Sequence, residues 1–271
     1  MGRPRAPGVV TFNLATIAQI SDPHVGVGPE HEATARALRR AVAEVGRLDP
    51  APKAVLLTGD LTHDGQPEEF ALVRELLEPL AMPVHPIPGN HDRREEMRAA
   101  FADHAGIAAA EGPLDYAIDC GPVRVINVDT WVERQAGGAI GAEQIGWIKR
   151  ELGAAGTKPV ILAMHHAPIG VGLDEFDRIG LAQEDRDSLR DLFEHGPAPE
   201  LVVTGHIHRA ASGQIGGVPI FVCPSCHLQV ELDMRREEKL RMGSDPPAIA
   251  IHVHGADPCL VSHVIPLASL D

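Results

Sequence analysis

Five short segments of this sequence, mostly apolar and typical of strands, each run into a loop that carries an aspartate, an asparagine or a histidine. The segments are Ala15–Ile20, Ala54–Thr58, Val84–Ile87, Val160–Met164 and Leu201–Thr204. The loops that follow read Ser21-Asp22-Pro23-His24, Gly59-Asp60, Gly89-Asn90-His91-Asp92, His165-His166 and Gly205-His206-Ile207-His208. In α/β folds, ligands collect where the carboxyl ends of the strands lie along one edge of a sheet. We therefore expect these polar side chains, which are scattered along the chain, to gather at one site.

The segments between these loops predict an α/β fold. Apolar residues recur at helical spacing in four stretches, Glu32–Leu48, Pro67–Leu80, Ala142–Leu152 and Asp185–Glu194. Turn sequences join three pairs of extended segments: Tyr116–Cys120 with Val123–Asp129, Gln214–Ile215 with Pro219–Cys223, and Ala248–His254 with Leu260–Ile265. We expect two packed mixed sheets flanked by helices in a single domain over residues 1–271, with 228–271 as a C-terminal cap or closing hairpin. The mixed charge run Glu231–Arg241 favours a solvated helix.

The charge of the chain argues against nucleic-acid polymers and membranes as partners. Lys and Arg number 24 against 38 Asp and Glu, a net charge of −14, and such a surface repels polyanions and anionic lipid. The stretch Met1–Ile20 has no cleavage site typical of a signal peptide, and no apolar run reaches the ~18 residues of a bilayer span. Cys223 and Cys226 have CxxC spacing, but no second pair completes a zinc site. We therefore expect reduced thiols in a cytoplasmic protein.

Together, the five loops resemble the calcineurin-like metallophosphoesterase superfamily, whose motifs they match in order over residues 15 to 225. Within it, Gly65–Phe70, His165-His166-Ala167-Pro168 and Cys223–Gln229 look like the bacterial class III cyclic nucleotide phosphodiesterases and the related glycerophosphodiesterases. The resemblance implies a four-layer sandwich of two mixed sheets flanked by helices, and a centre of two divalent metal ions. By the same resemblance, one ion would be bound by Asp22, His24, Asp60 and His208, and the other by Asp60, Asn90, His165 and His206, with Asp60 bridging.

The residue types in this set suit the implied chemistry. Imidazole and carboxylate donors without thiolate fit Mn, Fe, Zn or Co and do not select among them. A bridging carboxylate lets two ions sit ~3.5–4 Å apart, where a shared hydroxide attacks phosphorus in line. The resemblance gives His91 the role of binding the phosphoryl group, as Asn90 also would, or of protonating the leaving oxygen. It gives His227 a contact with the substrate. Asp92 would hold the His91 ring in one tautomer.

Other histidines have competing interpretations. Neighbouring side chains of an extended chain point in opposite directions, so only one of His165 and His166 should face the ions, and the family register favours His165. A second His-x-His pair, His252 and His254, lacks the preceding glycine turn and is expected to be structural. His63 defaults to a structural role, although it closely follows the second of the five loops.

The predicted activity is that of a metal-dependent phosphoric diester hydrolase acting on a small phosphodiester, with 3′,5′-cyclic AMP, hydrolysed to the 5′-monophosphate, as the leading substrate. A glycerophosphodiesterase or a broad hydrolase of small diesters is the alternative, which the aromatic content of only 3% favours, because a purine pocket often uses a ring to stack. A scaffold protein without metals is a remote third interpretation, since every candidate donor is present. Asp177–Leu181 either overhangs the site, as a loop of the resembling subgroup does, or is a plain surface connection. The sequence is compatible with a homo-oligomer.

Overall fold

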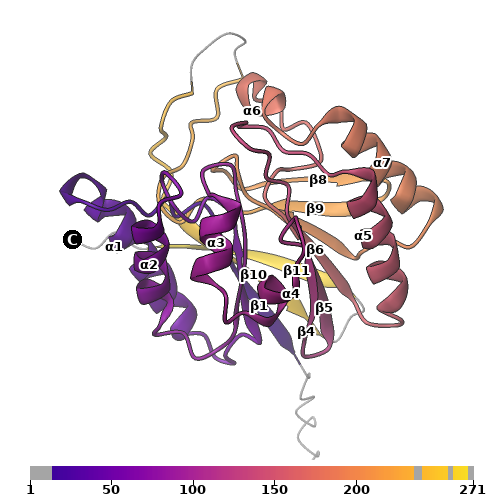
Figure 1. Ribbon diagram of the computed structural model, residues 1–271, viewed down its shortest axis with the longest axis horizontal. Coiled ribbons are helices and arrows are strands. Elements are labelled where there is room, and N and C mark those ends of the chain that lie inside the picture. The colour runs from indigo at the N-terminus through magenta and orange to yellow at the C-terminus, as the bar shows by residue number, and fades with distance from the viewer. Residues whose placement is uncertain (1–13, 235–239, 256–258, 268–271) are drawn as a thin grey trace, which may run out of the picture.

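Two mixed β-sheets form the centre of the fold (Figure 1). The computed structural model describes residues 14–234, 240–255 and 259–267. The first sheet has the strand order β11-β10-β1-β2-β3, in which β1, β2 and β3 are parallel and β10 pairs antiparallel with both β1 and β11. Its strands are β1 (Ala15–Ile20), β2 (Ala54–Thr58), β3 (Val84–Ile87), β10 (Ala248–His254) and β11 (Leu260–Pro266). The C-terminal hairpin therefore completes this sheet.

The second sheet has the order β4-β5-β6-β7-β9-β8, with a parallel centre and one antiparallel strand at each edge. Its strands are β4 (Tyr116–Cys120), β5 (Val123–Val128), β6 (Val160–Met164), β7 (Leu201–Thr204), β8 (Ala211–Ile215) and β9 (Val218–Val222). Both mixed sheets match the sequence prediction, including the three hairpins. The fold therefore presents the carboxyl ends of two sets of parallel strands.

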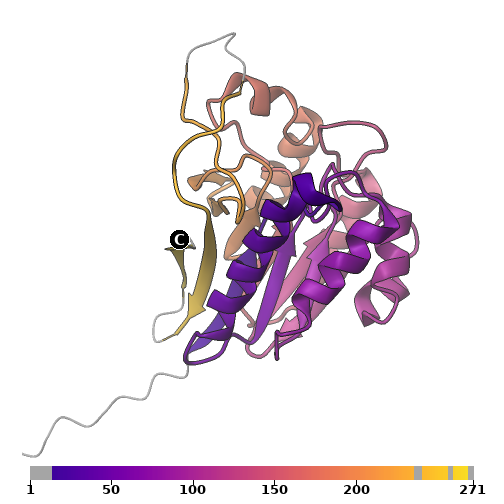
Figure 2. The ribbon, with the colours of Figure 1, turned by 90° about the vertical axis from the view of Figure 1, so that its left-hand side faces the viewer.

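Helices cover the outer face of each sheet. Figure 1 shows α1, α2 and α3 on one side of the molecule and α5 and α7 on the other, and Figure 2 shows α1 and α2 lying along the first sheet. The helices are η1 (Pro29–His31), α1 (Glu32–Gly46), α2 (Pro67–Leu77), α3 (Arg94–Ala100), α4 (Ala105–Ala109), α5 (Ala142–Ala154), α6 (Asp174–Arg178) and α7 (Gln183–His195). The molecule thus has four layers, in the order helices, sheet, sheet, helices.

The side chains of β6 show why both faces of the second sheet are apolar. Ile161 and Ala163 pack in the cluster that fills the space between the sheets, whereas Leu162 and Met164 pack in the cluster beneath α5 and α7. A strand covered on both faces reads as a continuous apolar run rather than an alternating one. The polar residues can then begin only where the strand ends, at His165.

Two parts of the fold differ from the sequence prediction. The expected helix Glu231–Arg241 is wrong for the residues that the structure describes, because the backbone amide of Glu231 donates to the carbonyl of Arg241 at 2.8 Å and Val230 bridges Met242 in antiparallel fashion. This charge run has too few apolar residues to pack a helix face, and its described residues, 231–234 and 240–241, are not helical. Residues 235–239 lie outside the described residues, as does 1–13, which carries most of the stretch used for the signal-peptide prediction.

The short helices α3, α4 and α6 were not expected, because five to seven residues are too few to show a helical period. Within the described ranges, no helix combines the length and the apolar composition that crossing a bilayer requires.

Candidate metal centre

The loops that follow β1, β2 and β7 bring together four side chains that could hold a metal ion. Ligand atoms of Asp22, His24, Asp60 and His208 all lie within 4.8 Å of one another. The Nε2 atoms of His24 and His208 face each other at 3.0 Å. His24 Nε2 is 3.5 Å from Asp60 Oδ2, and His208 Nε2 is 3.6 Å from Asp22 Oδ1. Two imidazoles and two carboxylates thus surround one point, and each sheet supplies part of the set.

A second group forms on the other side of Asp60. His165 Nε2 lies 3.4 Å from Asp60 Oδ1 and 3.3 Å from Asn90 Oδ1. A ring nitrogen of His206 lies within 4.8 Å of one on His165. Asp60 therefore presents Oδ2 to the first group and Oδ1 to the second, which is the arrangement that a bridging carboxylate requires.

Backbone carbonyls orient three of these imidazoles. His165 Nδ1 lies 2.9 Å from the carbonyl oxygen of Thr58, His206 Nε2 lies 3.1 Å from that of Ile179, and His208 Nδ1 lies 3.0 Å from that of Leu228. A carbonyl can only accept, so each of these ring nitrogens carries the proton. When such a ring carries only this proton, its other nitrogen is free to bind a cation, the usual arrangement of histidine ligands.

His166 lies beside this second group but uses both of its ring nitrogens elsewhere. Its Nδ1 is 2.7 Å from the hydroxyl of Thr130, and its Nε2 is 3.1 Å from the carbonyl of Ala136. Burial lowers the pKa of His166 to about 3, so the ring is neutral. Although a ring nitrogen of His166 also lies within 4.8 Å of His165 and His206, the hydrogen bonds favour His165 as the ligand and leave His166 supporting it.

The donor loops have a strained backbone. Among the described residues that are not glycine, positive φ angles occur at Asp22, His24, Asp60, His206 and His208, and otherwise only at Arg134. The left-handed conformation costs an L-residue roughly 1–2 kcal/mol, and strain of this kind clusters at functional sites. The loops thus hold an unfavourable geometry that aims their side chains inward.

Glycines next to the donors allow the loops to touch. A Cβ at Gly89 would overlap the backbone nitrogen and Oδ1 of Asp60, and would lie 2.8 Å from His165 Nε2. A Cβ at Gly205 would overlap the Ser21 hydroxyl and would lie 2.6 Å from Asp22 Oδ2. These positions therefore require glycine for close approach.

The electrostatics of the second group favour a positive charge. Burial acts to raise the pKa of Asp60, but His165 and His24 outweigh it and hold that pKa well below its usual value. Burial acts to lower the pKa of His165, but Asp60 and Asp22 outweigh it and raise that pKa to about 9. A proton on His165 is thus stabilised where a cation would bind. The donor set, its geometry and its charge all fit divalent metal ions.

The predicted role of Asp92 as the partner of the His91 ring is wrong. The buried carboxylate of Asp92 instead accepts from the backbone amides of Leu61 at 3.1 Å, Thr62 at 3.0 Å and Gly89 at 2.9 Å, and from the Thr62 hydroxyl at 2.7 Å. Asp92 therefore ties the loop after β2 to the loop after β3. The His91 ring is held by the carbonyl of His63, 2.9 Å from its Nδ1, so His63 takes part in the site through its backbone.

A cavity of about 420 Å³ opens over the donors. The residues proposed to contact substrate, Asn90, His91 and His227, all line it. Burial lowers the pKa of His227 to about 4, so its ring is neutral. Other walls are apolar and include Phe176, Ile179, Leu228, Val230, Leu240 and Met242. Because Ile179 lines this cavity, the segment Asp177–Leu181 does border the site.

Sequence reasoning missed the end of β5. Asp129, Thr130 and Trp131 follow this strand and reach Arg94 and His166. The signal was present, because Val123–Val128 is a sixth buried strand that runs into polar residues, as the other five do.

Comparison with known proteins agrees with this geometry. The model of the calcineurin-like phosphoesterase family matches residues 15–210. An Arcobacter nitrofigilis protein named "Probable glycerophosphodiester phosphodiesterase" is 28% identical over 91% of this chain and 91% of its own length. The 3′,5′-cyclic adenosine monophosphate phosphodiesterase of Pseudomonas aeruginosa is 31% identical over 79% of this chain and 76% of its own. A cAMP/cGMP dual specificity phosphodiesterase of Mycobacterium tuberculosis is 32% identical over 80% of this chain and 67% of its own.

Solved structures show the same fold at low sequence identity. A purple acid phosphatase from yellow lupin superposes with a TM-score of 0.67 at 13% identity, over 93% of this chain and 51% of that one. The family model covers most of the chain, and the donors that it would require converge at one centre. The chain therefore belongs to the calcineurin-like phosphoesterase family.

Proposed function

We propose that this protein hydrolyses 3′,5′-cyclic nucleotides, cyclic AMP first, to the 5′-monophosphate. The observation that carries the proposal is the position of Asp60, whose two carboxylate oxygens each face a separate group of donors. Such a site is suited to phosphoryl chemistry that uses two cations. Relatives named for cyclic nucleotide hydrolysis match more than three quarters of the chain and support this substrate class.

Two sets of residues would hold the ions, which are Mn, Fe, Zn or Co on the basis of their donors. The first set is Asp22, His24, Asp60 and His208, and the second is Asp60, Asn90, His165 and His206. When bound, such ions acidify a water molecule to supply the nucleophile and stabilise charge on the phosphoryl oxygens. The carbonyl bonds to His165, His206 and His208 keep the ligand nitrogens in position without rearrangement.

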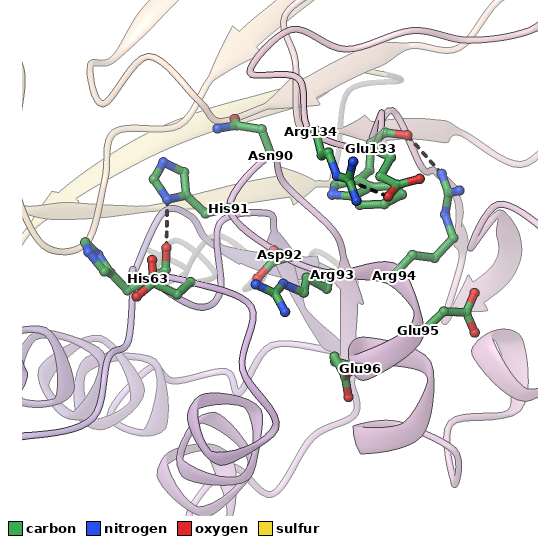
Figure 3. Close-up of a pocket in the computed structure, with 12 residues that line it drawn as sticks. His63, Asn90, His91, Asp92, Arg93, Arg94, Glu95, Glu96, Glu133 and Arg134 are labelled. Carbon is green, nitrogen blue, oxygen red and sulfur yellow. Dashed lines mark hydrogen bonds and ion pairs between the residues drawn. The ribbon is translucent and has the colours of Figure 1, made fainter.

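His91 is placed to act on the leaving oxygen. Its Nδ1 is held by the His63 carbonyl at 2.9 Å, and its backbone amide donates to Asp60 Oδ1 at 2.9 Å. The second ring nitrogen points away from His63 (Figure 3) and lines the cavity with Asn90. In its protonated form, His91 can donate from this nitrogen to the departing alkoxide, a general-acid role worth ~10²–10⁴-fold in rate.

The apolar wall of the cavity suits the base of a nucleotide. Phe176 is buried at the wall and packs edge-on against His206, with ring centroids 5.4 Å apart. Ile179 and Leu228 continue the wall beside it. An aromatic ring with aliphatic neighbours can cover the face of a purine. The cavity therefore contains an aromatic ring although the aromatic content of the whole chain is low.

The test is a hydrolysis assay with cyclic AMP, with manganese added and then removed by a chelator. We expect release of AMP that needs the metal and that falls by at least ~10²-fold in Asn90→Ala, because one donor and one phosphoryl contact are lost. His195→Ala, a change on the exposed face of α7 far from the centre, is the control. Full metal loading with no turnover of any cyclic nucleotide would remove this proposal.

A second candidate substrate is a glycerophosphodiester. The half-buried His227 in the cavity wall and the Arcobacter relative favour it. Turnover of cyclic AMP and of glycerophosphoethanolamine at equal concentration decides between the two. If His227→Ala reduces only the second activity, the glycerophosphodiester is the better substrate assignment.

A further inference from the structure

A second, larger cavity adjoins the candidate metal centre. This groove has a volume of about 820 Å³, against about 420 Å³ for the cavity over the donors. His63, Asn90 and His91 line both, so the two spaces meet at the residues assigned to the phosphoryl group and the leaving oxygen. Figure 3 shows His63, Asn90 and His91 at one end of the groove and Arg94, Glu133 and Arg134 at the other.

The far end of the groove is a rigid aromatic and cationic platform. The guanidinium of Arg94 lies over the ring of Trp131, 4.7 Å from its centroid. Arg94 Nε donates to the fully buried carboxylate of Asp129 at 2.7 Å, and Nη2 donates to the carbonyl of Trp131 at 2.9 Å. The backbone amide of Trp131 in turn donates to Asp129 at 2.8 Å. The buried carboxylate thus fixes both members of the stack before any ligand arrives.

Further hydrogen-bond donors line the groove, with Arg93 in its middle and Arg134 at the far end (Figure 3). Arg93 directly follows the loop after β3 and is exposed, and its stem packs close to Gly65. Arg134 lies three residues after Trp131 with a φ of 58°. Planar guanidinium groups donate in a fixed geometry and also stack on aromatic rings. A ligand with a flat ring and several acceptor atoms matches these walls.

A cyclic nucleotide bound at the centre would not extend into this groove. Both ester oxygens of a 3′,5′-cyclic phosphate belong to one ribose, so the departing oxygen stays on the nucleoside held by the apolar wall. In an acyclic diester, the departing oxygen belongs to a second group. That group leaves on the side of His91, where the groove begins.

We propose that the groove is a subsite for a leaving nucleoside, and that 3′,5′-linked dinucleoside monophosphates are a second class of substrate. The inference rests on the proposed function. In both substrates the enzyme would retain the 5′-nucleotide half and break the bond from phosphorus to O3′. The oxygen of a water molecule bonds to phosphorus as the bond from phosphorus to O3′ breaks. The electron pair stays on O3′, which takes a proton from His91, and one proton of the water passes to solvent. The products are a 5′-monophosphate and a free nucleoside.

Acidic residues restrict the length of the substrate. Asp64, Glu95, Glu96 and Glu133 also line the groove, and the net charge of the chain is −14. Each added phosphate would bring another negative charge toward this surface. A dinucleoside monophosphate carries only the one charge that the centre neutralises, so the groove favours it over longer strands.

The kinetic test compares two diesters that both release 5′-AMP. Adenylyl-(3′→5′)-adenosine has a nucleoside as its leaving group, and adenosine 5′-methyl phosphate has methanol. We expect a KM at least ~5-fold lower for the dinucleoside, because base stacking on an aromatic side chain is worth that factor or more. Trp131→Ala and Arg93→Ala should remove the difference, whereas Trp147→Phe on α5 and Arg190→Ala on α7 should keep it. Equal KM values in the wild type, or an unchanged ratio in Trp131→Ala, overturn the subsite.

A binding test separates this inference from the proposed activity. The chain has 2 Trp residues, so Trp147→Phe leaves Trp131 as the sole indole. Saturable quenching of its fluorescence by a dinucleoside analogue in which a methylene group replaces the bridging O3′, but not by the methyl ester, supports the subsite even if no diester is cleaved. If cyclic AMP is hydrolysed but the dinucleoside does not change the fluorescence, the proposed function stands and the subsite is rejected.

Discussion

At the scale of single residues, the site depends on which nitrogen of each imidazole is free. His165 and His166 are adjacent and equally buried, yet only His165 has a ring nitrogen directed at Asp60, at 3.4 Å. The difference arises because Thr58 accepts from Nδ1 of His165, whereas Thr130 and Ala136 take both nitrogens of His166. Sequence alternation predicts that the two rings diverge, but only these partners show which ring is free.

Matched substitutions of the two histidines test this difference. His165→Gln should lose one bound metal ion per chain and lower turnover by at least ~10²-fold, because a ligand is removed from the centre. His166→Gln should keep both ions and cost about 1–3 kcal/mol of unfolding free energy, since a buried hydrogen-bond partner is disturbed. Metal content by mass spectrometry and urea unfolding measure the two effects. Loss of metal from His166→Gln with full loading of His165→Gln would reverse the assignment.

At the scale of elements, short helix α3 is anchored to the end of β5 by one ion pair. Arg94 begins α3, directly after the loop that carries Asn90 and His91, and its partner Asp129 directly follows β5. Asp129 is fully buried and also accepts from the backbone amide of Leu114 at 2.8 Å. This contact joins the region after the first sheet to the second sheet beside the candidate centre.

Removing one partner of this pair should destabilise the protein more than removing both. Arg94→Met leaves a buried carboxylate without its cation, and we expect a loss of about 3 kcal/mol in unfolding free energy. Asp129→Asn combined with Arg94→Met removes both charges and should recover part of that loss. Chemical unfolding of the two single variants and the double variant measures the coupling. Strictly additive losses would show that the pair contributes nothing beyond its separate contacts.

Strand β10 carries a titratable group whose protonation state matters for stability. His252 is fully buried, with Nε2 at 3.0 Å from Gln19 Oε1 on β1 and Nδ1 at 2.8 Å from the Ser262 hydroxyl on β11. It is structural, as the sequence predicts for this pair. Burial lowers the pKa of His252 from 6.5 to about 3.

This shift predicts loss of stability in acid. The neutral ring is favoured in the folded state, so its contribution is complete above pH 6.5 and declines as the pH falls toward 3. Protonation in the unfolded state lowers the unfolding free energy by about 1.4 kcal/mol per pH unit within that window. Urea unfolding of the wild type and of His252→Gln between pH 7.5 and 5 should give curves that converge as the pH falls. Curves that stay parallel would mean that His252 does not titrate on unfolding.

At the scale of the whole molecule, the parts that the sequence predicted are those with local signals. The strands were predictable because apolar runs such as Val160–Met164 are buried on both faces, and the donors were predictable because they follow such runs. The hydrogen-bond donors to Asp92 could not be predicted, because a carboxylate can accept from any amide nearby. Leu61 and Thr62 are 30 or more positions away in the sequence. The groove could not be predicted either, since Arg94 and Trp131 lie in different parts of the sequence and contact each other only in the folded chain.

The centre joins the two sheets, so bound metal should stabilise the entire fold. Asp22, Asp60 and Asn90 follow strands of the first sheet, whereas His165 and His206 follow strands of the second. Ions that bind only the folded arrangement add RT ln(1 + [L]/Kd), about 4 kcal/mol when the free metal is 1,000 times Kd. We expect manganese to raise the melting temperature by several degrees and a chelator to reverse the change. Asp60→Asn should abolish most of the increase, because its bridging carboxylate contributes to both sets of donors. An equal increase in Asp60→Asn would mean that manganese binds elsewhere on this acidic chain, and the two-sheet centre would then have no role in metal-linked stability.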